Sequence, residues 1–359
     1  MHKESSFLSG AERGSVATKG SHVFKTAGLN TLAFGIIIAV QQILIFPSLG
    51  RLVDVSNFSH AVLFVTLSMI VVNVVGGEVS NVALLRGQRY SERKLPWDAP
   101  RLAFVSLLVC FAGLAILSVM QVLDWRLGVE YLLVIALGIV RTIGLAPDKF
   151  RGRFGGAVAV SCAYAVGAIV GLLLVQFSES AVIPFIIAEI LSVLTLMVLR
   201  FRSPAIRLTI KRTDEYANTR NRFYYLALVA VIMNAVSYLD RILIIPLLGA
   251  AALAVYYASS ALSKSLSMVS NPVANAFLAR LGSVDDTSRN TLFKKSVLMS
   301  APLFIVSVCI SYGISYVGVL LLYPQFFELA LEILVPISLA SALGVVSDLF
   351  RPLVMRFAA

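Results

Sequence analysis

The chain is a succession of long apolar segments separated by shorter polar stretches. A helix needs about 20 apolar residues to cross the hydrocarbon core of a bilayer. Hydrophobic residues make up 58% of the sequence and charged residues only 14%, whereas soluble domains average about 25% charged residues. Backbone amides in lipid must be hydrogen-bonded within their own segment. The sequence therefore predicts an all-α polytopic membrane protein.

We expect about ten transmembrane helices. They are predicted at residues 27–49, 58–85, 102–123, 128–146, 154–177, 181–199, 223–248, 251–279, 296–323 and 329–350. The polar N-terminal stretch lacks the order of regions found in a cleaved signal peptide. The first span is therefore expected to serve as the targeting signal as well.

The positive charge of the chain is distributed unevenly, and its distribution predicts the orientation. The net charge is +11. Lys and Arg gather in the N-terminal tail and in the polar stretches after every second span, whereas the opposite loops hold only Arg51 and Arg126. Positively charged loops stay in the cytoplasm, so both termini are predicted to be cytoplasmic in a multi-pass plasma-membrane protein. This explains the basic composition without a nucleic-acid partner, and it favours contact with anionic membrane lipids.

A short pattern occurs twice, 199 residues apart. The sequence Ile-Leu-Ile-x-Pro-x-Leu-Gly stands at Ile43–Gly50 and again at Ile242–Gly249. Aligned without a gap, residues 43–70 and 242–269 are identical at ten of 28 positions. The first span thereby pairs with the seventh and the second with the eighth, in the same orientation. A duplicated unit of six spans with parallel repeats is one known transporter design, in which substrate binds between the halves.

The repeat predicts a domain organisation with an incomplete second lobe, because a full second unit needs two more spans. The predicted parts are a cytoplasmic tail at 1–26, a six-span lobe at 27–199, a cytoplasmic inter-lobe loop at 200–222, a four-span lobe at 223–350 and a cytoplasmic tail at 351–359.

Three groups of residues carry a resemblance to a known family. They are Tyr238-x-Asp240-Arg241-x-x-x-x-Pro-x-Leu-Gly249 followed by Tyr256-Tyr257; Pro47-Ser-Leu-Gly-Arg51 followed by Phe58-Ser59; and Asn81-Val-Ala-Leu-Leu-Arg86, echoed by Asn275-Ala-Phe-Leu-Ala-Arg280. In these features the chain resembles the polysaccharide-flippase branch of the multidrug/oligosaccharidyl-lipid/polysaccharide exporter superfamily. The ten predicted spans depart from the 12 or 14 that are usual in that family, and Ser59 stands where many members have Gly.

The resemblance implies a two-lobed transporter in the bacterial inner membrane that needs no cofactor. Its expected substrate is an undecaprenyl-pyrophosphate-linked oligosaccharide, which it moves from the cytoplasmic to the periplasmic leaflet for the biosynthesis of a surface polysaccharide. The expected partners are the lipid-linked oligosaccharide, membrane lipids, and a polysaccharide polymerase with its co-polymerase.

Ionisable residues within the predicted spans are the candidate functional groups, since each costs about 3 kcal/mol on insertion unless it is paired or faces water. Arg241 and Lys264 are expected to contribute to a cationic cavity for the substrate phosphates, because Arg binds phosphate through two parallel hydrogen bonds. Asp240 is expected to orient Arg241 or a neighbour. Glu189 and Glu78 are candidates for a protonatable coupling site.

A structural role is the alternative for each of these residues. Asp240 and Arg241 point about 100° apart on a helix, so each is free to pair with another helix and lock the lobe. At the repeat offset, Gln41 and Gln42 stand opposite them, which makes the ionic pair specific to the second lobe. Lys264 is long enough to reach the interface, and Glu78 fits a buried carboxyl that stays neutral or bonds to a neighbouring helix.

Glycine and proline residues in the spans predict packing and bending. Gly76-Gly77 in the second span and Gly152, Gly155 and Gly156 around the start of the fifth favour close helix packing. Pro47, Pro246 and Pro272 lie within spans or at their ends, where proline kinks a helix.

Three other functions stay open at the level of the sequence. An ion-coupled small-molecule exporter of the same fold predicts a smaller, more aromatic cavity with an acidic lining. A membrane-bound glycosyl or acyl transferase predicts catalytic carboxylates or His in the loops, which the three histidines of this chain do not favour. A non-transporting assembly partner fits the short second lobe. The three cysteines have no metal-ligand spacing, so we expect no metal, no cofactor and no enzymatic activity.

Overall fold

The computed structural model describes residues 29, 32–87, 102, 104, 106–107, 125–150, 155–178, 180–202, 216–264 and 289–357. Within these ranges every secondary-structure element is a helix. Eight helical stretches in them are long and apolar enough to cross a membrane. They are Leu32–Leu52, Val55–Val82, Trp125–Asp148, Gly155–Val175, Ile183–Phe201, Thr219–Leu248, Ser300–Leu322 and Pro324–Ser347. The prediction of a polytopic helical membrane protein is thereby confirmed.

Each of the eight stretches overlaps one predicted span. The predicted span at 102–123 lies almost wholly outside the described residues. The predicted span at 251–279 is helical over 250–264, and its remainder also lies outside them. The same holds for the tail at 1–26 and for most of the inter-lobe loop at 200–222.

The chain divides into two compact units. The first unit consists of Met1–Ile45 and Leu63–Leu239, and the second of Phe46–Val62 and Asp240–Ala359. A short piece of the first predicted lobe, the turn between the first two spans, therefore groups with the C-terminal residues. The predicted division into lobes at 27–199 and 223–350 stays a prediction.

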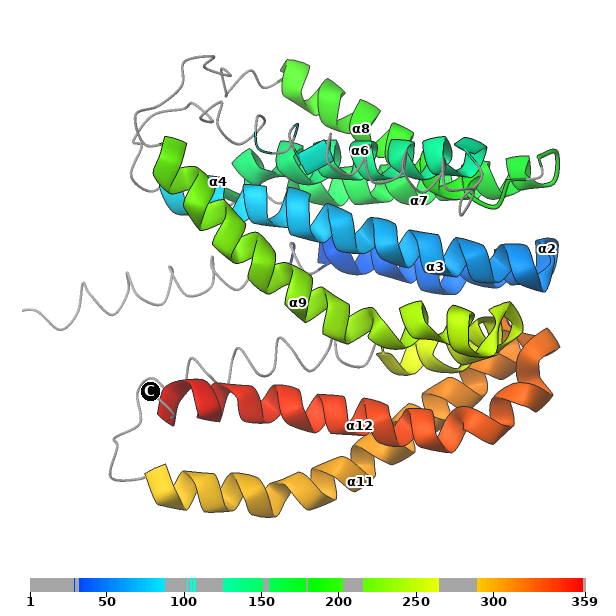
Figure 1. The fold of residues 1–359 in the computed structure, drawn as a ribbon, viewed down its shortest axis with the longest axis vertical. Coiled ribbons are helices and arrows are strands. Elements are labelled where there is room, and N and C mark those ends of the chain that lie inside the picture. Colours follow the sequence, from blue (N-terminus) through cyan, green and yellow to red (C-terminus); the bar gives the residue numbers. More distant parts are fainter. Residues whose placement is uncertain are drawn as a thin grey trace, which may run out of the picture. The chain divides into compact units, whose positions relative to one another are not determined.

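The first unit is built around a set of packed helices. Its elements are the π-helical turns η1 (Val40–Ile45) and η2 (Val72–Gly77), most of α3 (Val55–Val71), α4 (Glu78–Gly87), α6 (Trp125–Phe150), α7 (Gly155–Val175), α8 (Ile183–Arg202) and most of α9 (Tyr216–Leu248). Helices α6, α7 and α8 lie together (Figure 1), and α4 packs on α6.

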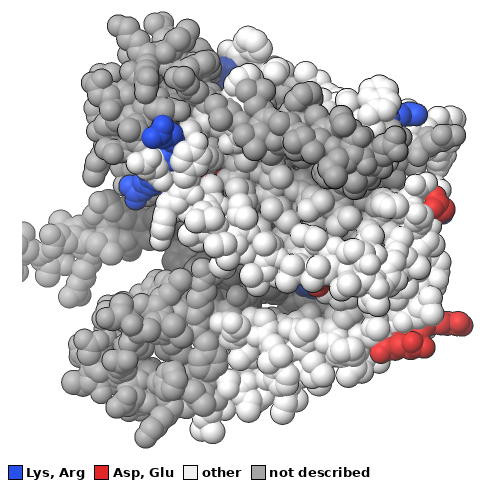
Figure 2. Space-filling view, in the orientation of Figure 1, with Lys and Arg blue, Asp and Glu red and all other residues white. Residues whose placement is uncertain are grey.

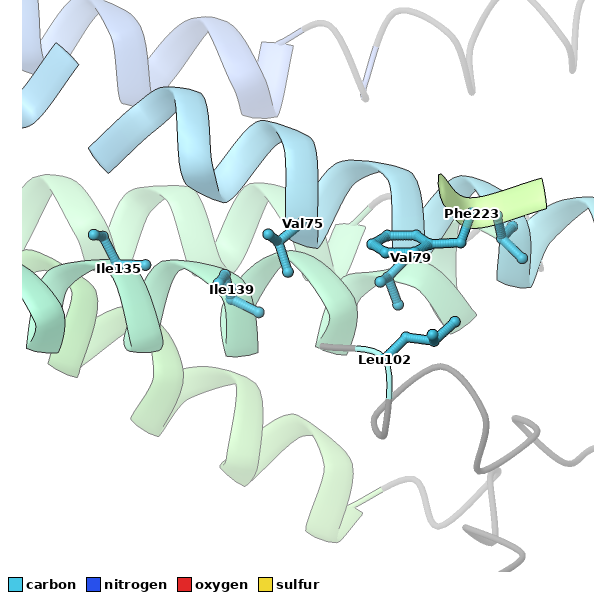
Figure 3. Close-up of a cluster of buried hydrophobic side chains, with 7 residues drawn as sticks. Val75, Val79, Leu102, Ile135, Ile139 and Phe223 are labelled. Atoms are coloured by element: carbon cyan, nitrogen blue, oxygen red, sulfur yellow. The ribbon is translucent and has the colours of Figure 1, made fainter. Parts of the chain in front are cut away.

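Branched aliphatic side chains fill the core of the first unit. Val75 and Val79, from η2 and α4, pack against Ile135 and Ile139 of α6, and Phe223 at the beginning of α9 closes the cluster (Figure 3). All five side chains are less than a tenth exposed. The outer surface is also apolar: on the face shown in Figure 2, the described side chains are almost all uncharged. Such a surface suits contact with lipid rather than water.

Helices α7 and α8 approach each other most closely at two glycines of α7. A Cβ atom added to Gly167 would lie 2.7 Å from the Cα of Ala188 and 2.7 Å from the carbonyl oxygen of Ile187. At Gly171 it would overlap the Cα of Pro184. The spacing of four residues places both glycines on one face of α7, and small residues at this spacing let helix backbones meet in membranes.

The second unit contains a helical hairpin. Helix α11 (Arg289–Leu322) is joined by the 3₁₀ turn η4 (Pro324–Phe326) to α12 (Phe327–Phe357) (Figure 1). The unit also includes α2 (Phe46–Leu52), the start of α3, the end of α9 and the helical segment 250–264. Gly249 separates α9 from the helical segment 250–264. Its positive φ of 87° is a left-handed conformation that suits glycine and ends α9.

Aromatic rings form the core of the second unit. The ring centroids of Phe58 and Phe326 lie 6.0 Å apart, and those of Tyr257 and Tyr323 lie 6.4 Å apart. Phe46 packs on Tyr257 at 4.8 Å. All five side chains are at most 5% exposed. Because Phe46 and Phe58 flank the turn between the first two predicted spans, this cluster fixes that turn to the C-terminal helices.

Hydrogen bonds from three side chains join the turns of the second unit. Arg51 Nη2 donates to the carbonyl oxygen of Leu321 at 2.7 Å, and Gln325 Nε2 donates to that of Gly50 at 3.0 Å. Ser59 Oγ donates to the carbonyl oxygen of Ala250 at 2.6 Å. The turns after the first, seventh and ninth predicted spans therefore meet at one end of this unit, as expected for loops on the same side of a membrane.

We predict that the α7–α8 contact tolerates no added methyl group. Gly167→Ala and Gly171→Ala should each lower the free energy of unfolding by about 1–3 kcal/mol, because the new Cβ meets backbone that cannot turn aside. Gly155→Ala on the same helix is the control, since a Cβ there has nothing within 4 Å. Thermal unfolding in detergent measures all three. Equal stability of the Gly171 and Gly155 variants would contradict the close contact.

Candidate functional site

The candidate site is a cluster of charged and phenolic side chains in the second unit. Asp240 lies on α9 within a membrane-spanning stretch, and Tyr256 and Lys264 lie on the helical segment 250–264 that follows it. Gly249 reverses the chain between the two helices. The side chains of Asp240 and Lys264 are each 32% exposed.

The Asp240 carboxylate accepts hydrogen bonds from two side chains on the neighbouring helix. Lys264 Nζ and the Tyr256 hydroxyl both donate to Oδ2. The backbone N–H of Arg241 donates to Oδ1 at 2.9 Å. The ammonium of Lys264 also lies 5.4 Å from the centroid of the Tyr256 ring, within the range of a cation–π interaction. Asp240 is thus the acceptor around which the cluster is arranged.

Arg241 is positioned differently from Lys264. It is buried, with 6% of its surface exposed. Its guanidinium carbon lies 4.9 Å from the centroid of the Tyr257 ring, which belongs to the aromatic core. The two predicted binding cations therefore differ in access: Lys264 is half-buried, whereas Arg241 is packed inside the unit.

The structure brings Asp240, Arg241 and Lys264 together, as the hypothesis of a cationic site requires. Asp240 pairs with the side chain of Lys264, whereas it accepts a hydrogen bond from the backbone N–H of Arg241. The expectation that Asp240 orients a neighbour therefore fits Lys264 best. The role of these residues in binding substrate stays a prediction.

A second polar cluster lies in the first unit. Arg141 of α6 binds Glu189 of α8 through two parallel hydrogen bonds, from Nε to Oε2 at 2.7 Å and from Nη2 to Oε1 at 2.9 Å. The guanidinium carbon of Arg141 lies 5.7 Å from the ring centroid of Tyr164 on α7. The Tyr164 hydroxyl in turn accepts a hydrogen bond from Gln41 Nε2 at 2.8 Å. Four helical segments thus contribute to one buried cluster.

Glu189 is held in this cluster and is only 7% exposed in its side chain, against 14% for Arg141. The pairing matches the structural alternative for this residue, and its role in coupling stays a prediction. Glu78 lies apart from both clusters: its carboxylate accepts a hydrogen bond from Asn81 Nδ2 on the same helix, at 3.1 Å.

One residue of each cluster lies at an aligned position of the sequence repeat. Gln41 and Asp240 are aligned at the offset of 199 residues. Each side chain is hydrogen-bonded to a tyrosine hydroxyl on another helix: Gln41 to Tyr164, and Asp240 to Tyr256. Each cluster also contains an Arg whose guanidinium faces a tyrosine ring. Among the described residues, the second cluster has Lys264 in addition.

Several members of these clusters were not singled out from the sequence. Arg141 stands close to a polar stretch and resembles a residue flanking a span, although its side chain lies inside the unit. Tyr164 is one of many aromatic residues in apolar runs. A tyrosine carries no signal of its own, and only the partner hydroxyl or carboxylate in the fold marks it.

In the described part of the chain, no group of three or more His, Cys, Asp or Glu side chains is placed to hold a metal ion. Comparisons with protein-family models, with curated proteins and with solved structures found no match. The interpretation of the site therefore depends on its own chemistry.

We predict that the Arg141–Glu189 pair contributes to stability as a unit. Glu189→Gln should lower the free energy of unfolding by about 3–5 kcal/mol, because it leaves a buried Arg without its counter-charge. Replacing both residues with Met should restore much of the loss. Arg126→Gln, which removes an exposed ion pair with Glu130, is the control and should change stability by at most about 1 kcal/mol. Equal losses in the single and double variants, measured by unfolding in detergent, would argue against a coupled pair.

Proposed function

We propose that this protein is a flippase of the polysaccharide exporter type. In this proposal it translocates undecaprenyl-pyrophosphate-linked oligosaccharide across the bacterial inner membrane by alternating access, for the biosynthesis of a surface polysaccharide. The observation that carries the proposal is the Asp240–Lys264 pair beside Arg241, because it combines partly exposed charge with an excess of cations on the membrane-spanning stretch of α9 and the helical segment that follows it.

The sign of the charge favours an anionic substrate. Asp240 contributes one negative charge, and Arg241 and Lys264 contribute two positive charges, so the three residues together carry one net positive charge. A cation within a membrane segment is costly unless it is paired or hydrated, and an anionic headgroup supplies a partner. A pyrophosphate offers several charged oxygen acceptors, which form stronger hydrogen bonds with ammonium and guanidinium groups than neutral acceptors do.

The repeat and the resemblance supply the rest of the argument. Two units that each contain a polar cluster suit a transporter that exposes a site alternately on each side of the membrane. The sequence Tyr238-x-Asp240-Arg241, which lies at the site, is also part of the resemblance to the polysaccharide-flippase branch. A polymerase and a co-polymerase are the partners that this function entails. A small-molecule exporter with an acidic lining fits the excess of cations less well.

We predict that Lys264→Ala reduces translocation about 10- to 100-fold, the loss expected from removing one hydrogen bond between charged groups. Lys264→Arg should keep a substantial part of the activity, because the positive charge remains. The measurement is transfer of a labelled polyprenyl-pyrophosphate-linked oligosaccharide across proteoliposomes that contain the purified protein. Arg126→Gln, at an exposed position, is the control for expression and insertion.

The same assay tests Arg241. Arg241→Ala should abolish translocation and also lower stability, since the residue packs on Tyr257, whereas Arg241→Lys should keep the charge and lose the planar contact. Full activity of Lys264→Ala and Arg241→Ala at normal protein levels would exclude a cationic substrate site here.

A further inference from the structure

The hydrogen bonds of Asp240 resemble those that a bound phosphate would make. Its two oxygens accept from an ammonium (Lys264), a phenolic hydroxyl (Tyr256) and a backbone N–H (Arg241). These are the donor types that bind phosphate oxygens in proteins. The carboxylate therefore occupies the acceptor position of Lys264, which the proposed function assigns to the substrate, and of two further donors beside it.

We propose that Asp240 is a resident competitor of the substrate, which holds Lys264 and Tyr256 when no anionic headgroup is bound and must release them for the phosphate to bind. This inference rests on the proposed function of the same site and adds a regulatory element to it. A carboxylate and a phosphate sharing one ammonium repel each other, so one anion displaces the other. Release of substrate is then assisted by the return of Asp240 to Lys264.

Exposure distinguishes this ion pair from a purely structural one. The side chains of Asp240 and Lys264 are each 32% exposed, whereas those of Glu189 and Arg141 are 7% and 14% exposed. An exchange of partners at the Asp240–Lys264 pair requires little repacking. The pair in the first unit is enclosed by α6, α7 and α8 and is suited to a permanent contact.

The position of Asp240 has an uncharged counterpart in the sequence repeat. Its counterpart in the first unit is Gln41, an uncharged amide that also bonds to a tyrosine hydroxyl. An amide at position 240 is therefore expected to preserve the bond with Tyr256 while removing the attraction for Lys264. The negative charge is an addition of the second unit, in the same cluster as its additional Lys.

The test is the affinity of the purified full-length protein for a soluble pyrophosphate diester that carries a short polyprenyl chain and one sugar. Asp240→Asn should bind this probe about tenfold more tightly than the unchanged protein, because the competing charge is gone. Arg126→Gln, which removes one charge at an exposed position of the first unit, is the control and should leave the affinity unchanged. Adding Lys264→Gln to Asp240→Asn should remove the gain.

The outcomes separate the competitor from a lock between helices. A lock predicts that Asp240→Asn loses stability and binds the probe equally or more weakly, and that result would overturn the inference. If Asp240→Asn unfolds in detergent, Asp240→Gln takes its place, since glutamine is the residue at the equivalent position of the first repeat.

The same data distinguish the inference from the proposed function. The unchanged protein could bind the probe and translocate substrate while neither Asp240→Asn nor Asp240→Gln binds the probe more tightly. That result would support the flippase proposal and contradict the inference that Asp240 is a competitor. Absence of binding in every variant, together with absence of translocation, would remove both.

Discussion

The cost of a charge in hydrocarbon is the constraint on which the arrangement of these helices depends. A charged side chain within a span must find a counter-charge, a polar partner or water. Glu189 meets this requirement through Arg141, which joins α8 to α6. Asp240 meets it through Lys264, which joins α9 to the helix that follows. Each pair thus specifies which helices are neighbours, where apolar side chains alone distinguish poorly between alternatives.

The two aligned positions of the sequence repeat carry different polar side chains. In the first unit a neutral amide, Gln41, reaches a tyrosine on α7, and the charges nearby form an enclosed pair. In the second unit the aligned residue is Asp240, and its pair with Lys264 is partly exposed. What differs is charge and access, the two properties that separate a binding site from a structural contact.

The sequence was sufficient for the fold class and for eight of the membrane-spanning stretches, because length and apolarity within a segment are local properties. It also located Asp240, Arg241 and Lys264 as unusual residues. It did not identify which charged residues pair, since an ion pair such as Arg141–Glu189 joins residues 48 positions apart. Glycines show the same limit. A Cβ added to Gly76 would lie 3.1 Å from the Cβ of Thr142, whereas one added to the adjacent Gly77 would have nothing within 4 Å.

The bonds that join the turns of the second unit have a consequence for sequence divergence. Arg51, Gln325 and Ser59 all donate to main-chain carbonyl oxygens. The accepting positions Leu321 and Ala250 supply only backbone, so their side chains are free to vary without weakening these bonds. Gly50 is an exception, because a Cβ added there would lie 3.0 Å from Gln325 Nε2. Arg51 and Gln325 have no such freedom, because their side chains are the donors. Among homologous chains we therefore expect one-sided variation at this end of the molecule, with substitutions accumulating at Leu321 and Ala250 and not at Arg51 or Gln325.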